Sequence, residues 1–195
     1  MCIYNIFAYL KFMTSLKPGV LLIADPFLKD PYFERTVILL CECNSDGGFG
    51  FVINKNVRYF LDDLVDDLKG FKYPVFYGGP VQLDTVHFIH TLPLLITGGV
   101  FIGNGMYWGG DFSIVKALIK GNNLPKEQIR FFVGYSGWDA GQLESELNEK
   151  TWLTVMATKK IVFNTTAKLI WPESIKLLGA AYLPLINYPK DPLLN

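Results

Sequence analysis

The chain has 195 residues, half of them hydrophobic, including 15 Phe, 10 Tyr and 4 Trp. This length fits one domain around a single core, because domains usually run about 100 to 200 residues. The 18 basic residues balance the 18 acidic ones, which argues against a polyanion-binding surface and makes direct binding to nucleic acid unlikely from the sequence.

The first part of the chain predicts three strands. Val20–Ala24 stops before Pro26, which disfavours a helix at the residue before it. Residues 36–41 form a continuous β-branched run that suits a strand covered on both faces. A turn at 44–48 leads into a third strand at 49–53, so the last two strands form a hairpin.

The middle of the chain predicts two helices separated by strands. Residues 59–68 place apolar side chains on one stripe and four aspartates on a solvated face, which predicts an amphipathic helix. Asp111 caps a second helix over Phe112–Lys120 that Gly121 closes. The four aspartates are Asp62, Asp63, Asp66 and Asp67, and the short strands between the helices are 74–77, 86–89 and 100–102.

The last part predicts two strands and two helices. A strand at 129–135 turns into a helix at 140–148, for which Asp139 is the N-cap and Gln142 the capping-box partner. A final helix begins with Pro172 at its first position and ends near Gly179, after a strand at 152–157. Strands interrupted by single helices, without a regular βαβ rhythm, predict an α+β domain with no internal boundary.

The cysteines indicate a reducing compartment. Cys2, Cys41 and Cys43 are an odd number without framework spacing, so we expect a cytoplasmic protein. The apolar start of the chain lacks a basic region and a cleavage site and is too short to span a bilayer, so we expect no membrane association. Cys41 and Cys43 are expected to share one strand face as small buried hydrophobes.

The segment 134–138 invites comparison with the nucleophile elbow of serine hydrolases, but its spacing does not fit. That turn needs a glycine two residues after the serine, whereas Gly137 follows Ser136 directly. His87 and His90 lie three apart on a strand and so point to opposite faces, which disfavours a metal site. No Walker or dinucleotide motif is present, and we expect no metal and no cofactor.

Several segments together resemble the YqgE/AlgH family of small bacterial proteins. Their order and spacing cover the chain from about residue 18 to its end, so we take 18–195 as one domain and 1–17 as an N-terminal extension. The segments are 31–37, 48–55, 78–81, 129–138, 141–144 and 191–195.

The resemblance implies a single α+β domain with a bulged, mixed β-sheet that is partly closed like a barrel and flanked by helices. It implies no established reaction, although members often carry the label of transcriptional regulator. We therefore expect a non-catalytic binding or regulatory protein with an unknown small-molecule or protein ligand. The candidate ligand-binding residues are Arg35, Asn54, Gly78, Gly79, Pro80, Tyr135, Ser136, Trp138 and Gln142.

Two alternatives stay open. The first is an enzyme with an unfamiliar active site near 134–142, for which Ser136, His90, Asp139 and Glu144 are the proton-transfer candidates. The second is a DNA-binding regulator, which rests on the family label and is opposed by the neutral charge and by only three arginines. For Trp138 itself, packing in the core and contact with a ligand are both open.

Overall fold

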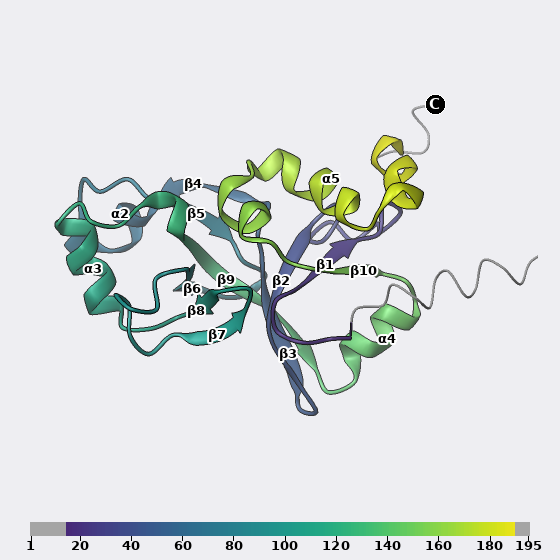
Figure 1. Ribbon diagram of the computed structural model, residues 1–195, viewed down its shortest axis with the longest axis horizontal. Helices are drawn as coiled ribbons and strands as arrows, with labels where there is room; N and C mark the ends of the chain where they lie inside the picture. The colour runs from purple at the N-terminus through teal and green to yellow at the C-terminus, as the bar shows by residue number, and fades with distance from the viewer. Residues whose placement is uncertain (1–14, 190–195) are drawn as a thin grey trace, which may run out of the picture.

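The computed structural model describes residues 15–189 (Figure 1). Most of the expected N-terminal extension, Cys2 and the segment 191–195 lie outside these residues. The described part is a single domain of strands and helices, so the α+β class is confirmed. Its strands are β1 Val20–Ala24, β2 Val37–Asn44, β3 Gly47–Val52, β4 Asn56–Phe60, β5 Pro74–Tyr77, β6 Val81–His90, β7 Val100–Gly103, β8 Met106–Trp108, β9 Ile129–Asp139 and β10 Trp152–Met156.

The ten described strands form one open sheet. Its main path runs β10-β1-β2-β3-β9-β6-β8-β7, with β5 joined to β9 and β4 joined to β5. The β5–β9 pair is parallel, while the other pairs are antiparallel, so the sheet is mixed. Within the described residues the end strands β10 and β7 do not pair with each other, and the expected barrel-like closure is not confirmed.

Strand β9 connects the two halves of the sheet. Its first part pairs with β5 and β6, and its last four residues pair with β3. Gly134 lies where β9 changes its partner strands, and its φ of 66° is a conformation that side-chain-bearing residues rarely adopt. Figure 1 shows β9 running from the part that carries α3 toward the part that carries β3.

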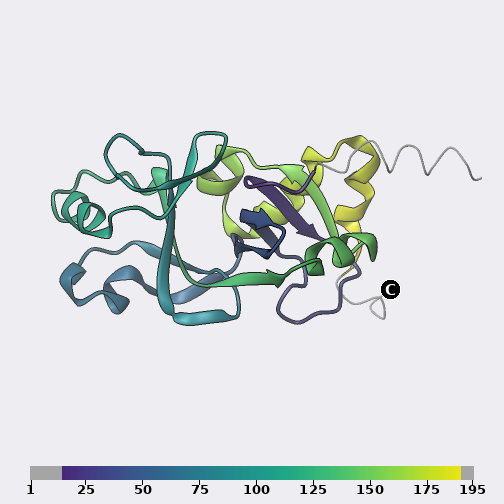
Figure 2. The ribbon, with the colours of Figure 1, turned by 90° about the horizontal axis from the view of Figure 1, so that it is seen from below.

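Helices cover the sheet on different sides. The helices are α2 Leu61–Leu64, α3 Phe112–Lys120, α4 Gln142–Asn148 and α5 Ala167–Leu177. Helix α5 packs Ile170 and Trp171 into the central core with β1 and β2, whereas α3 packs Val115 and Ile119 into a second core with β5 and β6. In both views α3 lies at one end of the molecule and the C-terminal turns lie toward the other (Figure 1, Figure 2).

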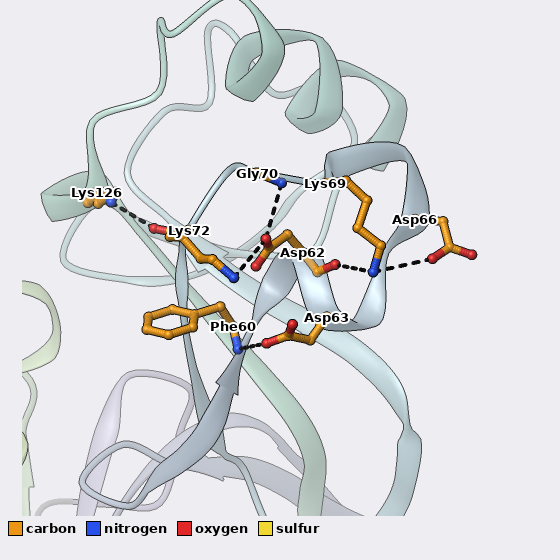
Figure 3. A network of polar contacts seen from close by, with 8 residues as sticks. All are labelled: Phe60, Asp62, Asp63, Asp66, Lys69, Gly70, Lys72 and Lys126. Atoms are coloured by element: carbon orange, nitrogen blue, oxygen red, sulfur yellow. Dashed lines mark hydrogen bonds and ion pairs between the residues drawn. The ribbon is translucent and has the colours of Figure 1, made fainter.

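The helix expected over 59–68 is wrong. Strand β4 extends to Phe60, α2 has only four residues, and a 3-10 turn follows at Asp66–Leu68. The reason is Asp62, which is buried rather than solvated and whose carboxylate contacts Lys72 at 3.0 Å and accepts the N–H of Gly70 at 3.1 Å (Figure 3). Burial alone would raise the pKa of Asp62, but these two contacts lower it overall.

One further expected boundary, the start of the last helix, is also wrong. Pro172 lies inside α5 and not at its first position, because Ile170 and Trp171 just before it are buried and packing outweighs the missing N–H. The helix does end before Gly179, as expected, where the φ is 101°. None of the helices in the described part has the length and apolar character needed to cross a membrane.

Candidate functional site

A cleft of about 650 Å³ opens between the β2–β3 hairpin, β8, the end of β9 and the start of α4. We call it the hairpin cleft. The β3–β9 pairing forms its base, with Gly48 opposite Trp138 and Phe49 opposite Gly137. Its lining residues are Glu42, Asn44, Asp46, Gly47, Gly48, Phe49, Val81, His87, Trp108, Tyr135, Gly137, Trp138, Asp139 and Gln142.

Three half-buried aromatic rings form one wall of the hairpin cleft. The centroid of Phe49 lies 4.7 Å from that of Trp108 and 5.9 Å from that of Tyr135, both with edge-on geometry. All three rings also pack against the central core. The wall is therefore held in place by the fold before any ligand arrives.

Three carboxylates lie on the rim of the same cleft. Glu42, Asp46 and Asp139 are exposed, and the lining contains no lysine or arginine. The Glu42 carboxylate accepts the side-chain amide of Asn44 at 3.0 Å. Among the described residues, no hydrogen bond or ion pair holds the carboxylates of Asp46 and Asp139. The rim therefore presents negative charge to the solvent.

His87 lies at the inner end of the cleft. Its ring packs between Phe51 and Tyr135, and burial lowers its pKa, so the imidazole is neutral near pH 7. Its Nε2 atom is buried and finds no partner among the described residues. His90 points to the opposite face of β6, where its Nε2 lies 3.0 Å from the carbonyl oxygen of Gly109. The expected separation of the two histidines is thus confirmed.

The expected strand–turn–helix corner at 134–142 is wrong in its details. Strand β9 continues through Ser136 to Asp139, and α4 begins only at Gln142, with Gly141 as its N-cap in the left-handed region. Half of the expected capping box is present, because Gln142 Oε1 accepts the N–H of Asp139 at 3.0 Å. Pairing with β3 extends the strand, and the sequence alone did not reveal this pairing.

Ser136 does not lie on the surface of the hairpin cleft. Its side chain is buried, and its hydroxyl donates to the carbonyl oxygen of Gly78 at 3.2 Å. Gly78 and Gly79 cross the backbone of β9 so closely that a Cβ atom on Gly79 would lie 2.2 Å from the carbonyl carbon of Tyr135. These glycines are required for that close approach, while Pro80 beside them is exposed.

Trp138 is buried, with 7% of its surface exposed, and it forms part of the wall between the hairpin cleft and a smaller pocket of about 340 Å³. Its indole N–H donates to Glu146 Oε2 at 2.9 Å, and Trp152 donates to the same oxygen at 2.7 Å. Gln142 donates to the other oxygen at 2.8 Å. The sequence analysis did not identify Glu146, although its position four residues after Gln142 is a signal for a contact on one helix face.

Arg35 and Asn54 lie in a different place, a pocket of about 450 Å³ between the segment just before β2, the segment just after β3, and α5. We call it the Arg35 pocket. The Arg35 guanidinium lies 4.8 Å from the ring centroid of Trp171 and donates to the carbonyl oxygen of Tyr188. Asn54 accepts the N–H of Val37 at 2.9 Å and donates to the carbonyl of Arg35 at 2.8 Å, so it ties two strand ends together. Arg35 and Asn54 thus line this pocket and Tyr135, Trp138 and Gln142 line the hairpin cleft, whereas Gly78, Gly79, Pro80 and Ser136 line neither.

Comparison with known proteins identifies relatives over most of the chain. The family model described as AlgH-like matches residues 21–183. A UPF0301 protein of Chlorobium limicola is 40% identical over 181 residues, which are 93% of this chain and 97% of that protein. A UPF0301 protein of Bacteroides thetaiotaomicron is 38% identical and covers 91% of this chain and 90% of its own length.

Two solved structures are similar as well. The solution structure of the AlgH protein from Pseudomonas aeruginosa has a TM-score of 0.71 and 28% identity, over 91% of this chain and 98% of that one. The crystal structure of protein DIP2367 from Corynebacterium diphtheriae has a TM-score of 0.74 over 90% and 94% of the two chains. At 19% identity, that second likeness concerns the fold alone.

Proposed function

Because this chain belongs to the AlgH-like family and carries the hairpin cleft, we propose that it is a non-catalytic binding or regulatory protein whose ligand occupies that cleft. The observation that carries the proposal is a preformed aromatic wall beside polar groups. A volume of about 650 Å³ lies within the range of small-molecule sites, roughly 300 to 1,000 Å³.

The positions of the proton-transfer candidates favour binding over catalysis. Of Ser136, His90, Asp139 and Glu144, only Asp139 lines the hairpin cleft. A nucleophile needs a base within hydrogen-bond reach, and the Ser136 hydroxyl is bonded to a backbone carbonyl. This arrangement supports a protein that holds a ligand without transforming it.

The proposal disfavours direct DNA binding and retains the cytoplasmic setting expected from the cysteines. A DNA-binding face needs clustered basic residues to neutralise phosphates, whereas the rim of the hairpin cleft carries Glu42, Asp46 and Asp139. Cys41 and Cys43 are both free thiols, in keeping with a reducing compartment. A regulatory role would then act through a bound small molecule or a protein partner.

The test is a small-molecule screen of mixed charge on ¹⁵N-labelled protein. We expect hits to shift the backbone amide signals of residues 47–49 and 137–139. We expect Tyr135→Leu to lower the affinity of these hits at least tenfold. Tyr59→Leu, which changes an exposed tyrosine outside the cleft, is the matched control and leaves the hits unchanged. Hits that gather elsewhere, or that are converted to products on incubation, would refute the proposal.

A further inference from the structure

We propose that the ligand of the hairpin cleft is a small organic cation, an ammonium or guanidinium group on an apolar body. This inference rests on the binding function proposed above and adds the charge class of the ligand. It follows from the juxtaposition of the three rim carboxylates with the wall of Phe49, Trp108 and Tyr135.

The rim carboxylates come from three separate backbone segments. Glu42 lies near the end of β2, Asp46 in the hairpin turn, and Asp139 at the end of β9. The register of the sheet brings the segments together, since Asn44 pairs with Gly47 and Gly47 pairs with Asp139. Their negative potentials add over one cleft with no basic residue in its lining, and a low-dielectric wall strengthens that potential.

The aspartates of the α2 region show what a structural acidic cluster looks like in this chain. There Asp62 contacts Lys72 at 3.0 Å, and Asp66 contacts Lys69 at 3.5 Å (Figure 3). Asp67 is likewise paired with lysines of α3. These three acids each contact a lysine and the fourth, Asp63, accepts the N–H of Phe60, whereas the hairpin cleft has no lysine or arginine among its lining residues.

The aromatic wall adds a second attraction for a cation. The faces of Trp, Tyr and Phe rings are negative and attract ammonium and guanidinium groups within about 6 Å of the centroid. Arg35, Lys72, Lys126 and Arg130 already use this attraction, but the rings they lie over are outside the cleft. A ligand with a cationic end and an apolar body would meet the rim and the wall together.

The neutral state of His87 favours the same ligand. Burial lowers its pKa, so the inner end of the cleft adds no positive charge near pH 7. An anionic ligand, in contrast, would have to approach through the three carboxylates.

The experiment compares three probes of nearly equal shape: phenethylamine, 2-phenylethanol and phenylacetate, titrated into the ¹⁵N-labelled full chain. We expect the amine to shift the amides of 47–49 and 137–139 with at least tenfold higher affinity than the other two. Added salt should weaken it, because charge attraction is screened. Agmatine, which carries a guanidinium and an ammonium group but no ring, tests charge without an aromatic body and should shift the same amides.

The matched variants separate charge from shape. The triple variant Glu42→Gln, Asp46→Asn, Asp139→Asn should lose the advantage of the amine, while Asp66→Asn, Asp84→Asn, Glu127→Gln removes equal charge outside the cleft and should keep it. If phenylethanol or phenylacetate binds the cleft as well as the amine does, the charge inference fails and the binding function stands. If none of the probes binds there, the charge inference fails, and the mixed-charge screen decides the binding function separately.

Discussion

The hairpin cleft and the Arg35 pocket contain the same kinds of group, charged side chains beside aromatic rings, but use them differently. In the Arg35 pocket the guanidinium lies against Trp171 and donates to the carbonyl oxygen of Tyr188, while its buried Nε atom has no partner among the described residues. In the hairpin cleft the carboxylates of Asp46 and Asp139 face solvent without a described partner. The difference separates polar groups that hold the fold together from polar groups that can receive a ligand.

Glu146 shows that the wall of the hairpin cleft itself contains a polar group that holds the fold together. Its carboxylate accepts the indole N–H groups of Trp138 and Trp152, so both rings are fixed by the protein's own acceptor. Trp138 is therefore an anchor for α4 against β9, although one side of it lines the cleft. A test of the comparison should change the anchors and the rim separately.

The largest effect is expected for Glu146→Ala. The change leaves two buried indole N–H groups without an acceptor, and each such group costs about 1–3 kcal/mol, so we expect a loss of about 2–4 kcal/mol in the free energy of unfolding. Urea denaturation measures it. Glu146→Gln keeps an acceptor oxygen and should lose less than half as much.

Glu149→Ala is the matched control for that prediction. It changes an exposed glutamate of the same region, whose side chain accepts the Ser145 hydroxyl at 3.3 Å. We expect a change within about 0.5 kcal/mol, as for most surface positions. Equal losses for Glu146→Ala and Glu149→Ala would contradict the role of Glu146 as the anchor of the wall.

Arg35→Ala should have the next largest effect, and on stability alone. It removes the contact with Trp171 and the hydrogen bond to Tyr188, which together are worth about 1–3 kcal/mol. Amine binding in the hairpin cleft should stay unchanged, because the two sites share no lining residue. Lys168→Ala, in the same pocket, is the control and should change stability by less than about 0.5 kcal/mol. Intact stability in Arg35→Ala would mean that Arg35 is available for a ligand.

The elements that could be predicted from sequence are those whose signal is local. The hairpin of β2 and β3 follows from β-branched runs around a glycine turn. The start of α3 follows from Asp111, whose side chain accepts the N–H of Ser113 at 2.8 Å, as expected for an N-cap. The YqgE/AlgH resemblance is confirmed, because it depends on the order of many short segments.

The elements that were missed depend on partners distant in sequence. Strand β4 is mostly exposed and forms only by pairing with β5, and β8 is a three-residue strand between β6 and β7. The expectation that Cys41 and Cys43 share a face is wrong, because a register shift between Leu40 and Glu42 turns Cys41 to the central core and Cys43 to the core beside α4.

The candidate site was predicted only in part for the same reason. Tyr135, Trp138 and Gln142 do line one cleft, but nothing in the sequence indicates that Glu42, Asp46 and Trp108 join them. The two strand registers that bring the hairpin onto β9 assemble these residues. Whether the candidate residues bind a ligand stays a prediction for the titrations above.

The smallest expected effect is the pH dependence contributed by His87. Burial lowers its pKa in the folded protein below the value of about 6.5 in an unfolded chain, so the unfolded state binds the proton more readily. The contribution of neutral His87 to the free energy of unfolding is therefore complete above about pH 6.5 and is lost as the pH falls toward the pKa of His87 in the folded protein. Urea denaturation at pH 7.5 and 5.5 should show a smaller loss for His87→Gln than for the unchanged chain. Arg35→Ala, a change in the other pocket, should keep the pH dependence of the unchanged chain. An identical pH dependence in His87→Gln would mean that the imidazole is solvated in the folded state. His87 could then be protonated there and would add positive charge to the inner end of the cleft.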